Sequence, residues 1–228
     1  MARATVSAFT GFVIILFALT VTRPADGGYA TRLMYPFDIG DAPSLPWGSD
    51  WWQGRADYNL ANLLADTEEL LTPSPPIIVR LETLRRAAIY ASNDRHVAEL
   101  LFRTFSERAR AAEQSRRPDP VVFLDAAFVT DTLWQIGEHS NPPFTEQSRQ
   151  VRGVVDGVDG YAFIKKSRAF GLNDPALEFG AAMIAGVRRL GTVTFAEHAR
   201  KARAGANHDS LVARNLDRIY AGRDLGVR

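Results

Sequence analysis

The stretch that decides the fold spans residues 161–190 and reads YAFIKKSRAFGLNDPALEFGAAMIAGVRRL. Two apolar patterns with a helical period, 161–170 and 175–190, flank a short turn that ends in Asn173 and Asp174. Asparagine and aspartate are favoured at the N-cap of a helix, and proline is tolerated in the first turn because its missing N–H would have no partner there. The stretch therefore predicts a helical hairpin.

Similar patterns continue on both sides of this hairpin. Apolar residues recur with a period of about 3.6, and runs of proline, glycine, serine, asparagine and aspartate separate them. No stretch alternates strictly enough to predict a strand. The predicted fold class is all-α, with antiparallel helical hairpins that form a repeat-like array or a bundle. The expected helices begin near Tyr58, Ser74, Asp94, Asp119, Thr145, Tyr161, Pro175, Thr194 and Asp209.

The residues at the helix boundaries repeat along the chain. The run Lys166–Ala169 followed by Asp174 has an echo, at an offset of 35 residues, in Lys201–Ala204 followed by Asp209. A single hairpin cannot bury its own apolar face, so hairpins of this kind stack on one another. The offset predicts stacking in the C-terminal part of the chain.

This spacing and the stretch FAEHARKA at 195–202 resemble tetratricopeptide-type helical repeats. The resemblance covers about residues 161–221, with a fainter echo at 81–105. It implies an array of hairpins with an extended surface for other proteins. The sequence departs from the family where the closing proline is expected, at Leu172 and Asn207, and Ala176 replaces the early aromatic residue. A helical bundle whose loops share capping residues is the alternative.

Residues 1–26 differ from the rest of the chain. The run Phe12–Val21 is almost entirely apolar, and helix-breaking residues follow it. Two interpretations fit this pattern: a signal peptide cleaved after Ala30, which would give a secreted protein, or a transmembrane anchor over residues 5–21. We favour the uncleaved anchor over both the signal peptide and a buried core helix. The rest of the chain is then expected outside the cytoplasm, in the periplasm of a bacterial cell.

Residues 27–52 form a turn-rich linker that contains many aromatic side chains. Such rings pack on the protein's own helices, at the membrane interface or on a partner. We predict that they bind a partner. The candidate contact residues are Tyr35, Phe37, Trp47, Trp51 and Trp52.

Residues 53–226 are expected to form the helical domain. Glycines and two aspartates gather at 153–160. A calcium loop of the EF-hand type would need more oxygen ligands and a terminal glutamate. We therefore predict a hinge at 153–160.

Composition excludes several classes of function. The chain has no cysteine, which rules out disulfides, thiol nucleophiles, iron–sulfur clusters and cysteine-based zinc sites. The formal net charge is +1, so bulk charge does not predict nucleic-acid binding. Charge is nevertheless uneven, because acids dominate residues 38–69 and arginines are abundant in 80–117 and 200–228. These regions are solvated helix faces, or they face each other, a partner or anionic head groups.

No motif predicts catalysis, a metal or a cofactor. The chain has no phosphate-binding glycine loop, nucleophile elbow or histidine pair with metal-ligand spacing. His198 and His208 flank an expected loop, and we interpret them as surface histidines near helix ends. The predicted function is a non-enzymatic scaffold or accessory subunit of a membrane-associated protein complex. The alternative is a hydrolase of helical fold that acts on cell-envelope material through acid/base carboxylates.

Overall fold

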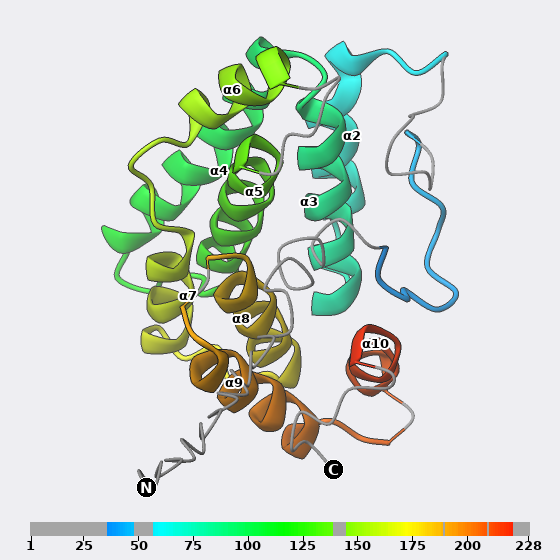
Figure 1. Ribbon diagram of the computed structural model, residues 1–228, viewed down its shortest axis with the longest axis vertical. Coiled ribbons are helices and arrows are strands. Elements are labelled where there is room, and N and C mark those ends of the chain that lie inside the picture. Colours follow the sequence, from blue (N-terminus) through cyan, green and yellow to red (C-terminus); the bar gives the residue numbers. More distant parts are fainter. Residues whose placement is uncertain (1–35, 48–56, 139–144, 189, 209, 221–228) are drawn as a thin grey trace, which may run out of the picture.

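A computed structural model describes residues 36–47, 57–138, 145–188, 190–208 and 210–220 (Figure 1). Within these ranges all regular structure is helical and no strand occurs, which confirms the predicted all-α fold class. The expected N-terminal hydrophobic helix lies outside the described residues. Among the described helices, none is both long enough and apolar enough to cross a membrane.

The helices follow one another with short connections. A 3₁₀ turn, η2, precedes the first α-helix. The elements are η2 (Leu60–Asn62), α2 (Leu63–Leu70), α3 (Ile77–Ala91), α4 (Arg95–Glu113), α5 (Val121–Glu138), α6 (Thr145–Val154), α7 (Gly160–Ala169), α8 (Pro175–Val187), α9 (Thr192–Gly205) and α10 (Leu211–Tyr220).

Aspartate side chains cap several of these helices. Asp94, Asp159 and Asp174 each accept a hydrogen bond from a backbone N–H in the first turn of α4, α7 and α8. Asp119 accepts one from Val121 N–H at 3.0 Å at the start of α5. Such caps satisfy amide groups that have no partner inside the helix. Asp94, Asp119 and Asp174 therefore cap helices where the sequence predicts helix starts, and Asp159 is a further cap that the sequence analysis did not name.

The expected cap at Ser74 is wrong. Helix α3 begins later, at Ile77, with Pro76 at the N-cap position and no side-chain cap. Pro76 has extended backbone, with ψ 141°, so the two prolines before Ile77 precede the helix instead of forming its first turn. Ser74 lies before the helix, where its hydroxyl oxygen is 3.4 Å from a guanidinium nitrogen of Arg80.

Helix α5 is central to the arrangement. It packs against α3, α4, α6, α7 and α8, and the buried apolar residues of these helices belong largely to one core (Figure 1). Helix α7 runs antiparallel to α5: Gly160 at its start adjoins Asp131, whereas Ser167 near its end donates to the carbonyl oxygen of Pro120 at 2.8 Å. Helices α8 and α9 share an extensive contact.

Helix α8 approaches its neighbours closely at Gly180. A Cβ atom at this position would lie 2.8 Å from the ring of Phe128 on α5 and 3.3 Å from Leu81 on α3. No side chain larger than hydrogen fits without a shift of these two residues. The small residues of 175–190 thus serve close helix packing, as their pattern indicates.

Candidate functional site

The described residues contain three features that the sequence analysis singled out: part of the aromatic linker, His198 and the 153–160 segment. The linker segment 36–47 runs along one side of the helical body, at the right in Figure 1, and its buried rings join the core. Phe37 is only 4% exposed, and its ring meets that of Phe179 edge-on at a centroid distance of 5.1 Å. Phe128 lies on another side at 6.4 Å. The ring therefore belongs to the core between α5 and α8.

A buried ion pair on α3 holds the backbone at Phe37. Arg85 donates to both carboxylate oxygens of Glu82, at 2.8 and 2.7 Å, and the Phe37 N–H donates to the same carboxylate at 3.0 Å. The Arg85 guanidinium also lies 5.2 Å from the centroid of the Phe37 ring. Burying a charge is unfavourable unless it is paired and hydrogen-bonded. The Phe37 N–H of the linker thus gives the buried Glu82 carboxylate an additional hydrogen bond, in a place that water does not reach.

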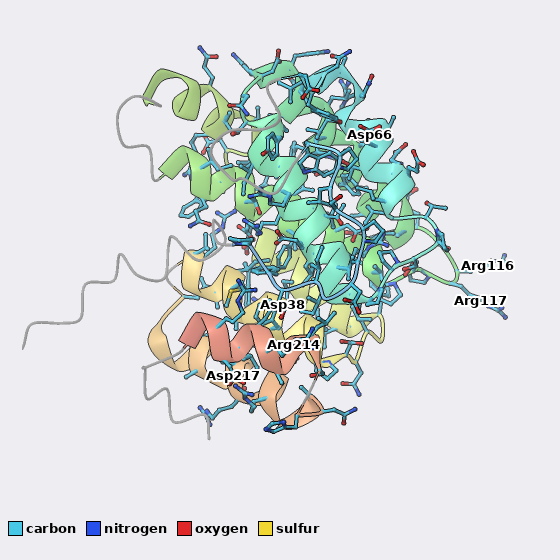
Figure 2. All side chains as sticks on the ribbon, turned by 90° about the vertical axis from the view of Figure 1, so that its right-hand side faces the viewer. Asp38, Asp66, Arg116, Arg117, Arg214 and Asp217 are labelled. Atoms are coloured by element: carbon cyan, nitrogen blue, oxygen red, sulfur yellow. The ribbon has the colours of Figure 1, made fainter. Side chains whose placement is uncertain are left out.

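The next residue, Asp38, joins the linker to α10. Its N–H donates to Asn215 Oδ1 at 2.7 Å, and Asn215 Nδ2 donates back to the Asp38 carbonyl oxygen at 2.8 Å. Arg214 Nε donates to the Asp38 carboxylate at 3.0 Å. The hydrogen bond from Gly40 N–H and the nearby Arg214 hold the pKa of Asp38 below its usual value, against the opposing effect of burial. Figure 2 shows Asp38 and Arg214 side by side.

Trp47 ends the docked segment and is fully buried. Its ring lies 6.0 Å from that of Tyr58 and 6.5 Å from that of Tyr90 on α3. The prediction that Trp47 and Phe37 present their rings to a partner is therefore wrong. A segment without helical structure still contributes to the core when its aromatic rings fill space between helices. Tyr35, Trp51 and Trp52 lie outside the described residues.

His198 on α9 is not a surface residue, in contrast to the sequence interpretation. It is 4% exposed, its Nδ1 lies 2.8 Å from Oε2 of Glu178 on α8, and its Nε2 lies 2.6 Å from the hydroxyl of Tyr161 on α7. Arg168 donates to the other Glu178 oxygen at 2.5 Å. We call Tyr161, Arg168, Glu178 and His198 the histidine network.

The histidine network keeps its carboxylate charged and its phenol neutral. Burial tends to raise the pKa of Glu178, but the hydrogen bond from His198 and the charge of Arg168 outweigh it, so this pKa is lowered. Burial raises the pKa of Tyr161. The ionised carboxylate orients the imidazole, whose other nitrogen lies within hydrogen-bond distance of the phenol hydroxyl. The arrangement fastens three helices together, and it disfavours a tyrosinate nucleophile at neutral pH because Tyr161 retains its proton.

The expected hinge at 153–160 is a packed turn. Val155 is fully buried, and Arg188 at the end of α8 donates to the Val158 carbonyl oxygen at 3.0 Å. Arg188 is also hydrogen-bonded to the buried carboxylate of Asp131. Gly160 lies so close to Asp131 that a Cβ atom would clash with the carboxylate. These contacts join the C-terminal end of the segment to Arg188 and to Asp131 on α5.

Beside this turn, the indole of Trp134 is near two guanidinium groups. Those of Arg188 and Arg152 lie 4.3 and 4.8 Å from its ring centroid. Cations over an indole face are attracted by its quadrupole. Burial raises the pKa of Asp131 to about 7, and Arg188 opposes the shift. The helical pattern alone did not reveal this cluster, because its members come from α5, α6 and α8.

In the part of the chain that the structure describes, no three acidic or histidine side chains converge as a metal site would require. Trp47, Phe37 and Asp38 bind the linker to the body, and the histidine network joins α7, α8 and α9. Comparison of the chain with protein-family models, with curated proteins and with solved structures gave no match.

Proposed function

We propose that this protein is a non-enzymatic scaffold or accessory subunit of a membrane-associated complex. Residues 5–21 tether it to the membrane, and the helical domain lies outside the cytoplasm. The observation that carries the proposal is the docking of residues 36–47 onto the helical body.

The docked segment lies just downstream of the expected anchor. Through Phe37 it contacts α3, α5 and α8, and through Asp38 it contacts α10. Residues 36–47 are thus fixed to helices from both halves of the sequence. A tethered scaffold benefits from this arrangement because this part of its linker is held against the helical domain.

Two sets of residues are the proposed partner contacts. Tyr35, Trp51 and Trp52 form the first set, because they flank the docked segment in sequence. The hairpins of 161–221 supply the second set, in the repeat-like arrangement that the resemblance implies.

The hydrolase alternative would need an accessible carboxyl group of raised pKa. Asp131 has such a pKa, but it is fully buried and its carboxylate is hydrogen-bonded to Arg188. A substrate would have to displace the packing of α5, α7 and α8 to reach it. Burial of this group favours a structural role, and the scaffold is therefore the better of the two proposals.

The test is affinity purification of the tagged full-length chain from detergent-solubilised membranes, followed by mass spectrometry. We expect the chain to sediment with membranes, to resist alkaline carbonate extraction and to co-purify with a defined set of proteins. An Asp38→Ala variant should stay in the membrane fraction but recover less of these proteins, because the Arg214 contact is lost.

Asp41→Ala is the matched control, since Asp41 is an exposed aspartate of the same segment. Equal recovery with both variants would show that docking of the segment is unimportant for partner binding. Release of soluble fragments from cell-envelope material by the purified protein would instead support the hydrolase.

A further inference from the structure

Phe170 exposes an aromatic surface at the C-terminal end of α7. It is 40% exposed, and among the described residues only Leu190 is a comparably exposed large apolar side chain. The ring stacks nearly parallel on that of Phe123, with a centroid distance of 5.0 Å and an interplanar angle of 13°. Its position is thus fixed before any partner binds, which lowers the entropy lost on association.

The α4–α5 loop brings two arginines to the same end of the molecule. Ser167, three residues before Phe170, donates to the carbonyl oxygen of Pro120 in this loop at 2.8 Å. Arg116 and Arg117 are exposed, and Figure 2 shows both side chains extending away from the body. Neither guanidinium has a hydrogen-bond or ion-pair partner within the described residues. We call Arg116, Arg117 and Phe170 the basic–aromatic face.

The acidic residues around this face are already engaged. Glu113 pairs with Lys166, and Glu178 is bound by Arg168 and His198. Asp119 and Asp174 use their carboxylates to cap α5 and α8. The neighbouring carboxylates therefore have intramolecular partners. The guanidinium groups of Arg116 and Arg117, with five N–H donors each, have no such partner among the described residues.

We propose that the basic–aromatic face binds an acidic segment of a partner protein that also carries an aromatic or aliphatic side chain. This inference rests on the proposed scaffold function and names the chemistry of its partner. Guanidinium groups match carboxylates with two parallel hydrogen bonds. Arginine and aromatic residues are also the types that most often dominate binding energy at protein interfaces.

The geometry favours a protein over an anionic membrane surface. A ring that inserts into the interface of a bilayer has to project from the protein surface. The Phe170 ring instead stacks on Phe123, so that only its other face is available for contact. The Ser167–Pro120 hydrogen bond holds the end of α7 against the loop that carries the two arginines. An extended peptide can therefore place carboxylates on the arginines and an apolar side chain on the Phe170 ring.

The test measures binding of a fluorescent random copolymer of glutamate and tyrosine to the full chain in detergent, by anisotropy. We expect binding that weakens at high salt, because the contact is exposed. An Arg116→Gln/Arg117→Gln variant should lose at least about tenfold in affinity, equivalent to about 1.4 kcal/mol. Phe170→Ser should weaken binding as well. Circular dichroism checks that each variant is folded.

The matched control is Arg95→Gln/Arg103→Gln, which removes the same charge from exposed positions on α4. Equal losses with both double variants would reduce the effect to net charge and overturn the proposal. So would the absence of copolymer binding, or binding only to phosphatidylcholine vesicles that contain phosphatidylglycerol. Co-purification of membrane proteins with the Arg116→Gln/Arg117→Gln variant at the wild-type level would refute this face while leaving the scaffold proposal intact.

Discussion

His198 Nδ1 lies 2.8 Å from Glu178 Oε2, and this buried polar contact adds to the extensive packing of α9 on α8. The other imidazole nitrogen reaches Tyr161 on α7 at 2.6 Å. One histidine thus joins three consecutive helices. The histidine network contacts α7, α8 and α9, so removing its imidazole should weaken the packing of all three helices.

We expect a graded series of effects on the free energy of unfolding. Tyr161→Phe should lower it by about 1 kcal/mol, the typical net value of one hydrogen bond. His198→Ala should lower it by about 2 kcal/mol or more, because Glu178 and Tyr161 both lose a partner. Arg168→Ala should matter least, since this side chain is 41% exposed. Urea denaturation followed by circular dichroism gives the values.

His96→Ala provides the control for the histidine series. His96 is exposed on α4, and its backbone N–H, which alanine retains, donates the hydrogen bond that the Asp94 carboxylate accepts. Its replacement should change stability by less than about 0.5 kcal/mol. If His198→Ala behaves like His96→Ala, the network contributes nothing measurable to stability.

The helix boundaries were predictable because their cause is local. Asp174 and Pro175 carry the capping chemistry in adjacent positions, and α8 begins there. His198 was not predictable, because its partners lie 20 and 37 residues away in sequence. The sequence pattern does not tell which helix face meets which neighbour.

The burial of the linker rings was not predictable from the sequence either. Trp47 and Phe37 lie in a segment without helical period, and periodicity is what distinguishes a buried face from an exposed one. Their burial depends on space left between α3, α5 and α8, which only the assembled helices define. The prediction from sequence assigned these two rings to a partner, whereas both pack against the chain itself.

Trp47→Ala should destabilise the fold strongly. The ring is fully buried against Tyr58 and Tyr90, and truncation of a buried aromatic residue typically costs about 3–5 kcal/mol. Thermal unfolding should show a markedly lower melting temperature. Leu190→Ala, at an exposed position, should leave it nearly unchanged. An unchanged melting temperature for Trp47→Ala would contradict the burial of this ring.

Two glycine-to-alanine changes in helices should change the free energy of unfolding in opposite directions. Gly180→Ala places a Cβ atom 2.8 Å from the Phe128 ring and should destabilise by about 1–3 kcal/mol, since the close contact forces α8 away from α5. Gly153→Ala in α6 meets nothing within 4 Å and should stabilise by about 0.5–1 kcal/mol through helix propensity. Paired urea titrations measure both. Equal effects would show that α8 is not closely packed there.

Asp131 should make stability depend on pH. Burial raises its pKa from 3.8 to about 7 in the folded chain, against the opposing charge of Arg188. The folded state then binds more protons than the unfolded state between these values, so this group lowers the free energy of unfolding as pH rises from about 4 to about 7. Each pH unit inside the window contributes up to about 1.4 kcal/mol.

The Asp131→Asn variant removes this dependence while keeping the shape of the side chain. Because the lowered pKa values of Asp38 and Glu178 act in the opposite direction in acid, the informative quantity is the stability of wild type minus that of the variant. We expect this difference to fall between pH 4 and pH 7 and to level off above. Arg188→Gln should move the fall to higher pH, because the cation that favours the carboxylate is gone. Carbon-13 NMR of the Asp131 carboxyl group gives the folded-state titration directly. A titration midpoint near 4, together with a stability difference between wild type and Asp131→Asn that does not change with pH, would show that Asp131 is solvated in the folded protein.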